Sequence, residues 1–310
     1  MQNQLKTWLA RLIVCALLTA MTSFPAMAAI AFVQDIGQDE LYAGGSTTSL
    51  GVSATTNVRA GDVIVLEVVF SGSTNGLSPS VSDSGANTYT FIGGTGSVAG
   101  TLQTYLYVAP VTTALHPGDA ITVSFVTNLP NAYNVAISAQ EFSGVSTDLD
   151  DYTPDVLNAG GTTTNFSTGP LVTANANDLL LAYVAIGSTA GTAVNQTTSP
   201  TFTQAIPYLD VGAHITFFSS YSIVSTTSSY VYAGNFDLVA GNSPPPFAVG
   251  IYALKAAAVA PPPISVTVAA PALSPFNLYG LVLLFAATAW LALHKVANRM
   301  RSIYQLVDRG

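Results

Sequence analysis

The sequence predicts an all-β protein: a jelly-roll-like antiparallel β-sandwich of two pseudo-repeated halves, with one added helix near each end of the chain. Two observations on the interior predict the strands. Short apolar runs rich in β-branched and aromatic residues, such as 63–70 and 179–186, are bounded by Gly, Asn, Asp and Pro. No long interior stretch shows the apolar spacing of a helix. A third observation, an internal repeat, predicts the two halves.

The repeat consists of five pairs of similar segments in the same order. Arg59-Ala-Gly-Asp and Asn175-Ala-Asn-Asp open the two series, and the paired segments are 59–66 with 175–182, 88–93 with 201–206, 102–108 with 215–224, 120–125 with 229–236, and 135–142 with 247–254. We expect pseudo-repeats over about 58–143 and 174–254, closing as two Greek keys over one core. Two separate small domains are the alternative, and we disfavour it because each half alone would bury little apolar surface.

The chain start has the layout of a secretory signal peptide. Lys6 and Arg11 precede a short apolar stretch, 12–21, and the small-residue ending Ala26-Met-Ala28 follows. An uncleaved anchor is the alternative, but the apolar core is about half the length that a spanning helix needs. We expect cleavage after Ala28. Because the only cysteine, Cys15, lies in this segment, the mature protein has no disulfide and no thiol chemistry.

Near the other end, residues 276–293 carry no charge and would form a helix about 27 Å long, enough to span a thin bilayer. Positive charge follows at once and predicts a cytoplasmic tail; its members are His294, Lys295, Arg299 and Arg301. The expected layout is a signal peptide (1–28), a β-sandwich (29–254), a Pro/Ala-rich linker (255–271), a sorting motif with a transmembrane helix (272–294) and a basic tail (295–310).

The segment before this helix, Pro271-Ala-Leu-Ser-Pro-Phe276, resembles the IPTL-CTERM class of bacterial sorting signals, a relative of the PEP-CTERM signals. Pro271, Leu273, Ser274 and Phe276 match its order, while Ala272 and Phe276 stand where Thr and Trp are usual. The resemblance implies handling by an exosortase-like, membrane-embedded sorting enzyme in a Gram-negative cell. It leaves open whether the protein is released after processing or stays anchored in the membrane.

A second resemblance concerns the β-sandwich. The order Gly-Asp-x-Ile from Gly61, 81–90 and Glu141-Phe-Ser-Gly-Val is similar to a β-sandwich module of large secreted bacterial proteins. It implies the fold and no activity.

The predicted sandwich is strongly acidic. Between Ala29 and Leu254 there are fifteen Asp or Glu residues and one basic residue, Arg59, a formal charge of −14. Such a surface repels nucleic acid and anionic lipid head groups. Neutral ligands such as glycans, or divalent cations, are the compatible partners.

Candidate catalytic residues are few, and we expect no enzyme. His116 lies in a predicted turn and His214 at a strand start, with no nucleophile elbow, phosphate loop or zinc pair nearby. Glu67 and Glu141 sit on predicted strands and would act as a glycosidase pair only if about 5–10 Å apart in a cleft. No local sequence marks either of them as acid or nucleophile.

Calcium is the one cofactor that the sequence suggests. Closely spaced aspartates fall in a predicted loop between the two halves, and hard cations take such oxygen ligands; they are Asp148, Asp150, Asp151 and Asp155. A second candidate is the turn 83–87. A solvated acidic turn is the alternative at both places.

We therefore expect an exported surface protein with a non-catalytic adhesion or structural role. A calcium-supported carbohydrate-binding module is the second reading, and an enzyme the third. An exposed row of aromatics on one sheet face would favour the second, and the residues to inspect are Tyr105, Tyr107, Phe217, Tyr221, Tyr230 and Tyr232.

Overall fold

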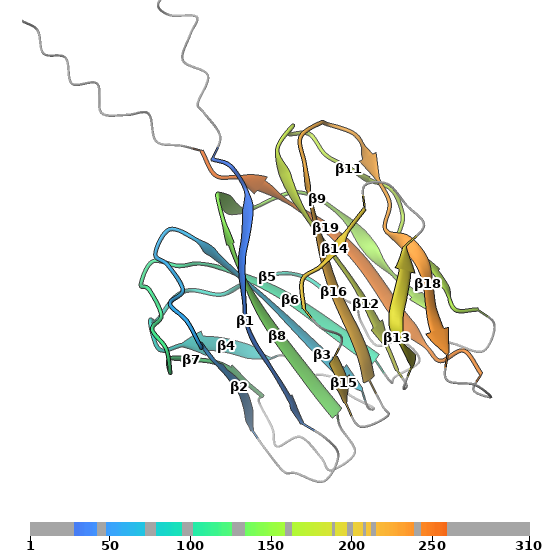
Figure 1. Ribbon diagram of the computed structural model, residues 1–310, viewed down its shortest axis with the longest axis horizontal. Coiled ribbons are helices and arrows are strands. Elements are labelled where there is room, and N and C mark those ends of the chain that lie inside the picture. Colours follow the sequence, from blue (N-terminus) through green and yellow to red (C-terminus); the bar gives the residue numbers. More distant parts are fainter. Residues whose placement is uncertain are drawn as a thin grey trace, which may run out of the picture. The chain divides into compact units, whose positions relative to one another are not determined.

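The computed structural model describes residues 28–41, 48–71, 79–94, 102–125, 134–158, 163–187, 190–196, 201–206, 209–211, 215–238 and 243–258 (Figure 1). The chain divides into one compact unit over Met1–Ala260 and a second over Pro261–Gly310. All described residues belong to the first unit. The expected signal peptide (1–28, apart from Ala28), the sorting motif at Pro271, Leu273, Ser274 and Phe276, the transmembrane helix and the basic tail lie outside them.

The first half of the unit contains two antiparallel sheets. The larger has the strand order β1-β8-β3-β6-β5 and the smaller β2-β7-β4. Their bounds are β1 Ala31–Leu41, β2 Ser49–Ser53, β3 Val63–Ser71, β4 Ser80–Asp83, β5 Thr90–Gly93, β6 Leu102–Pro110, β7 Ala120–Ser124 and β8 Asn134–Ser143. The central strand β3 is apolar along nearly its whole length, because both faces of its sheet are covered.

The second half repeats this organisation. Its large sheet has the order β14-β16-β12-β19-β9, with β15 also paired to β16, and smaller sheets have the orders β10-β18-β13 and β11-β17. The bounds are β9 Val145–Asn158, β10 Asn165–Ser167, β11 Leu171–Val172, β12 Asp178–Ile186, β13 Ala190–Gln196, β14 Thr203–Gln204, β15 Leu209–Val211, β16 Ile215–Val224, β17 Ser229–Tyr230, β18 Ala233–Leu238 and β19 Phe247–Ala256.

The two halves have matching strand orders when β1 is aligned with β9, β8 with β19, β3 with β12, β6 with β16 and β5 with β14. The small sheets β2-β7-β4 and β10-β18-β13 match in the same way. Even the isolated bridge between Val58 and Leu115 has a counterpart in the pairing of Leu171 with Tyr230. The matching elements therefore begin at β1 and β9, earlier than the segments whose similarity is visible in the sequence.

Three apolar clusters fill the spaces between these sheets. One lies within the first half, between its two sheets, and includes Ile64 and Tyr107. Another, within the second half, includes Leu180 and Tyr232. The third joins the two large sheets and contains Val65 and Val69 together with Leu181 and Phe217. Because this shared cluster draws on both large sheets, the halves form one compact unit.

The all-β, antiparallel class that the sequence predicts is confirmed, and the described ranges contain no helix. One local expectation is wrong. The aspartate-rich segment after Thr147, expected as a loop, belongs to strand β9. This strand lies at the edge of its sheet, where charged residues and a proline such as Pro154 are tolerated because one row of backbone groups needs no strand partner.

Candidate functional site

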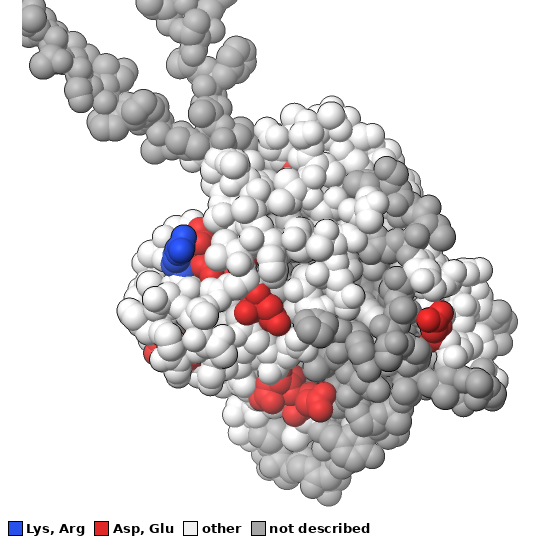
Figure 2. All heavy atoms as spheres, viewed as in Figure 1, with Lys and Arg blue, Asp and Glu red and all other residues white. Residues whose placement is uncertain are grey.

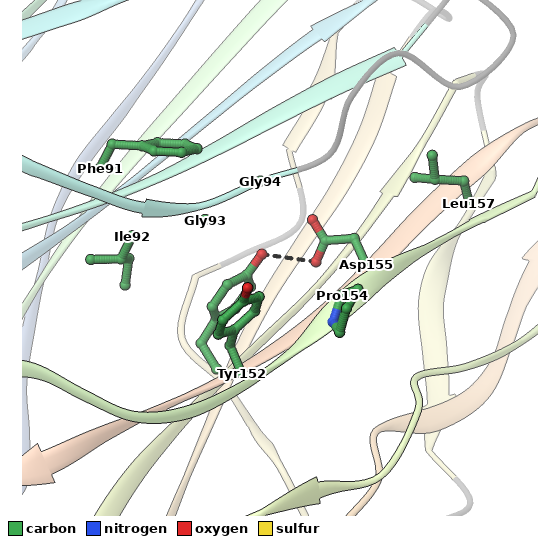
Figure 3. A pocket seen from close by; sticks show the side chains of 9 residues that line it. Phe91, Ile92, Gly93, Gly94, Tyr152, Pro154, Asp155 and Leu157 are labelled. Atoms are coloured by element: carbon green, nitrogen blue, oxygen red, sulfur yellow. Dashed lines mark hydrogen bonds between the residues drawn. The ribbon is translucent and has the colours of Figure 1, made fainter.

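A hollow of about 390 Å³ opens where the edge strand β5 of the first half meets the edge strand β9 of the second. Figure 3 shows its wall from both strands, with Phe91 and Ile92 on opposite sides of β5 and Pro154 and Leu157 on the β9 side. The lining residues are Phe91, Ile92, Gly93, Gly94, Tyr152, Pro154, Asp155, Leu157 and Tyr252. Its volume lies in the range typical of small-ligand sites.

Among the described residues that line this hollow, Asp155 is the one with a charged group. Its two carboxylate oxygens accept hydrogen bonds from two tyrosine hydroxyls, Tyr183 Oη at 2.6 Å and Tyr252 Oη at 2.9 Å (Figure 3 draws the second). Burial raises the pKa of Asp155 to about 6, and the two hydrogen bonds oppose that rise. Each carboxylate oxygen has a further lone pair with which it can accept a hydrogen bond from a ligand.

Glycines make room for this arrangement. A Cβ atom at Gly250 would overlap both Asp155 Oδ1 and the Tyr183 ring, and one at Gly93 would overlap the Tyr252 ring. A side chain at either position would therefore displace the tyrosines that hold the carboxylate.

Aromatic rings form the exposed part of the hollow. Tyr152 is 54% exposed and Phe91 is 53% exposed. The Tyr152 ring stacks on Tyr252, with centroids 6.2 Å apart and planes 8° apart, and Tyr252 stacks in turn on Tyr183 at 6.4 Å. These contacts hold the exposed Tyr152 ring on a buried aromatic base.

A second hollow, of about 470 Å³, lies on the other side of Phe91 and is lined by Pro79, Ser80, Val81, Tyr89, Phe91, Tyr105 and Tyr107. It opens between strand β4 of the small sheet and strands β5 and β6 of the large sheet. Phe91 contacts Tyr107 edge-on at 5.6 Å and Tyr105 at 6.0 Å. The two hollows thus share one aromatic residue.

The four predicted calcium ligands are held by different protein groups. Asp150 accepts hydrogen bonds from the backbone N–H groups of Ala174 (2.5 Å) and Asn175 (3.1 Å). Asp151 accepts one from Val172 N at 2.9 Å, and the backbone N–H of Asp148 donates to Ser146 Oγ at 3.1 Å. With Asp155 in the tyrosine network, the structure does not gather these carboxylates around one point. No group of three potential metal ligands occurs in the described part of the chain.

The second calcium candidate, residues 83–87, forms a turn closed by its own side chains. Asp83 accepts from the backbone N–H and from the side-chain amide of Asn87, both at 2.9 Å. Asn87 Oδ1 in turn accepts from the backbone N–H of Thr112 at 2.8 Å. The turn composition read from the sequence therefore corresponds to a turn that connects two parts of the first half.

Glu67 and Glu141 lie on opposite faces of the same sheet. Glu67 alternates with residues of the cluster shared by the two halves, and burial raises its pKa to about 8, opposed by hydrogen bonds to Ser219 and Gln140. Glu141, also buried, accepts a hydrogen bond from Arg59 N at 2.7 Å. The two carboxyls therefore do not meet in a cleft as a glycosidase pair would.

The remaining candidates fall in ordinary structural positions. His116 is exposed in a turn, with Nδ1 3.6 Å from Asp119 Oδ2, and His214 lies outside the described residues. Of the aromatics proposed as an exposed row, Tyr107, Phe217, Tyr230 and Tyr232 are buried, and Tyr105 and Tyr221 are half-buried. Tyr105 and Tyr107 line the second hollow, and Tyr230 lines a separate one, of about 380 Å³, next to the end of β16.

Three residues of the hollows, Phe91, Tyr152 and Tyr252, were not among the candidates from sequence. Tyr152 lies within the aspartate-rich segment that the sequence suggested as a calcium site. Its position between Asp151 and Asp155 was the one sequence signal of exposure, because an aromatic residue among carboxylates on an edge strand has one face in water.

The surface of the described unit bears separated acidic patches, and the face in Figure 2 carries several of them with one basic patch. No helix within the described residues is both long and apolar enough to cross a membrane. Comparison of the chain with protein-family models gave no match, and a search of curated proteins gave none either.

Proposed function

We propose that this chain is an exported cell-surface protein, membrane-anchored or sorted at its C-terminal signal, whose β-sandwich has a non-catalytic adhesion or structural role. The sequence signals at residues 1–28 and 271–301 support the export and anchoring. The observation that supports binding is the pair of exposed rings at the hollow, Phe91 and Tyr152, of which Tyr152 stacks on the buried Tyr252 that donates to Asp155.

Adhesion fits this site better than catalysis does, because of how its groups are bonded. The Asp155 carboxylate already accepts from two tyrosine hydroxyls, and the described lining residues include no Ser, Thr, Cys, Lys or His to act as an activated nucleophile. Rigid aromatic rings, by contrast, supply a large contact area at a low cost in conformational entropy.

Carbohydrate binding is the second candidate, and the same hollow favours it. Sugar rings have apolar faces that pack on flat aromatic rings and hydroxyls that donate to a carboxylate. The lining offers both, and its described residues include no cation that would select an anionic ligand. The calcium-supported form of this proposal rests on the aspartates Asp148, Asp150, Asp151 and Asp155 alone.

The strand orders also support a finer fold proposal. In the first half, the large sheet takes the first, eighth, third, sixth and fifth strands and the small sheet the second, seventh and fourth, and the matching strands of the second half have the same order. This alternation of strands between two sheets is that of a jelly roll, so we assign a jelly-roll-like fold to each half.

Cell fractionation tests the export and anchoring. Membrane, periplasmic and released fractions are separated, and mass analysis determines the N- and C-termini of the protein in each. A mature start at Ala29 is expected. An intact 276–293 segment in the membrane fraction would support the permanent anchor over release, and a cytoplasmic protein that retains residues 1–28 would contradict the proposal.

A glycan array, probed with the full-length protein in detergent, separates the two roles. Binding to neutral glycans supports the carbohydrate-binding role, and its loss on adding a chelator supports the calcium form. If no glycan binds and the melting temperature is the same with calcium and with chelator, the second candidate is contradicted and the structural role is favoured.

A further inference from the structure

The two hollows described above adjoin along three sheet edges. One is bounded by β4 and β5, the other by β5 and β9, and Phe91 lines both. These strands belong to the small sheet of the first half, its large sheet, and the large sheet of the second half. A ligand that follows this path crosses the exposed ring of Phe91 on its way from one hollow to the other.

Three of the tyrosines along the path have their hydroxyls bonded to the protein. Tyr107 Oη donates to Pro79 O at 2.7 Å, Tyr89 Oη donates to Asp83 Oδ2 at 3.0 Å, and Tyr252 Oη donates to Asp155. Because these three hydroxyls already donate to protein oxygens, these tyrosines contact a ligand mainly through their ring surfaces. Aromatic rings therefore follow one another along the path, and hydrogen bonds to the protein hold them in place.

Charge narrows the class of ligand. Among the described residues that line the two hollows there is no Lys, Arg or His, and Asp155 is the one carboxylate. A polyanion would find no counter-charge and would meet a net acidic domain. A polycation would find one carboxylate along the whole path. A neutral chain with apolar ring faces and hydroxyl donors matches the aromatic rings and the single acceptor.

We propose that the two hollows are adjoining subsites for consecutive sugar rings of one linear, neutral polysaccharide, with Phe91 as the platform that they share. This inference rests on the carbohydrate-binding candidate above and goes beyond it, because it specifies an extended chain bound along its length instead of a single terminal sugar.

The test is a chain-length series. Full-length protein in detergent is titrated calorimetrically with neutral linear glucan, mannan and xylan oligosaccharides of one to six sugars, and with cationic chitosan oligomers. For the series that binds, affinity should rise with length until both hollows are filled, by about tenfold, the gain expected of one further aromatic platform.

Variants locate the effect. Phe91→Ala should weaken the longer oligosaccharides about tenfold and remove most of the dependence on length, and Phe91→Tyr should restore it. Val172→Ala is the matched control, because Val172 is 59% exposed and lines neither hollow. Melting curves show whether each variant is folded.

Each outcome tests one part of the proposal: the shared platform, the neutral chain, the location of the site or carbohydrate binding itself. A single sugar bound as tightly as a hexasaccharide overturns the shared platform and leaves carbohydrate binding standing. Binding of the chitosan oligomers alone overturns the neutral chain. If Val172→Ala weakens binding as much as Phe91→Ala, the site lies elsewhere, and if no oligosaccharide binds, both this inference and the carbohydrate-binding candidate fail.

Discussion

Glu67 and Tyr183 occupy equivalent positions in the two halves of the protein. Each follows an aspartate by five residues, Asp62 in one half and Asp178 in the other, and each points from its central strand toward the core that the two large sheets share. Tyr183 Oη bonds across to Thr104 Oγ1 at 2.7 Å, and Glu67 bonds across to Ser219. Thr104 is on β6 and Ser219 on the matching strand β16, so two polar contacts of different chemistry join the halves at related places.

The pKa of Glu67 predicts that the protein loses stability as the pH rises from acidic to slightly alkaline values. Burial raises this pKa to about 8 in the folded chain, whereas the unfolded value is near 4.3. The unfolded chain therefore releases this proton first, and stability falls as the pH rises between these two values. Glu67→Gln should remove this loss and raise the free energy of unfolding at pH 8 by several kcal/mol, at about 1.4 kcal/mol per pKa unit.

Denaturant unfolding at pH 5 and pH 8 measures this effect. Val172→Ala provides the control, because it changes an exposed side chain and removes no titratable group, so the pH dependence should be unchanged. Equal destabilisation of Glu67→Gln at both pH values would mean that Glu67 is ionised in the folded protein.

Carboxyl pairs at the start of each central strand predict a second pH effect. Burial and the neighbouring Asp150 raise the pKa of Asp178 to about 7, against the opposing charge of Lys255. Both oxygens of Asp178 are buried without a hydrogen-bond donor, so this carboxyl is stable when a proton joins it to Asp150. Stability is then lost as the pH rises from about 4 toward 7.

Asp178→Asn supplies that donor permanently. The variant should melt higher than the native protein at pH 8 and close to it at pH 4, as scanning calorimetry can measure. The first half has the related pair Asp62 and Glu141, in which burial and Glu141 raise the pKa of Asp62 to about 6, so Asp62→Asn should act in the same direction. A lower melting temperature for Asp178→Asn at pH 8 would contradict the shared proton.

The contact between Thr104 and Tyr183 should contribute measurably to joining the halves. Thr104→Val and Tyr183→Phe each remove one partner of a buried hydrogen bond, at a cost of about 1–3 kcal/mol. A double-mutant cycle measured by denaturant unfolding should give a coupling energy of about 1 kcal/mol. Additive effects within error would show that the bond adds nothing to stability.

Gly250 is predicted to be essential for the Asp155 network. A methyl group there would overlap Asp155 and the Tyr183 ring, so Gly250→Ala should lower the free energy of unfolding by about 1–3 kcal/mol, the usual cost of overpacking. Gly51→Ala is the control, since its Cβ would meet only ordinary contacts at 3.5 Å. Similar thermal unfolding of both variants would mean that Asp155 and Tyr183 can shift to accommodate the methyl group without loss of stability.

The sequence predicted the strands better than the site. Runs such as 63–70 are strands in the structure because β-branched residues alternate toward two covered faces, a local property. The repeat was visible only where residues are similar, so β1 and β9, which match by pairing and not by sequence, escaped it. Local composition does not determine which strands, distant in the chain, pair with one another.

Asp155 illustrates what the sequence alone could not provide. It was predicted as a calcium ligand from its neighbours in the chain, but its partners Tyr183 and Tyr252 come from strands β12 and β19. For the same reason, the sequence does not predict which face of its strand Glu67 occupies. Which face a strand residue occupies depends on the sheet register, and a shift of one residue reverses it.

Attachment of intact cells to immobilised neutral glycan tests the central claim most directly. Cells displaying the native protein or Tyr152→Ala are compared at equal surface labelling, with Val172→Ala as the control. We expect cells with the native protein and with Val172→Ala to attach alike and cells with Tyr152→Ala to attach about tenfold less, since the exposed aromatic platform is lost. Attachment unchanged by Tyr152→Ala, or a protein that cannot be labelled on intact cells, would contradict it.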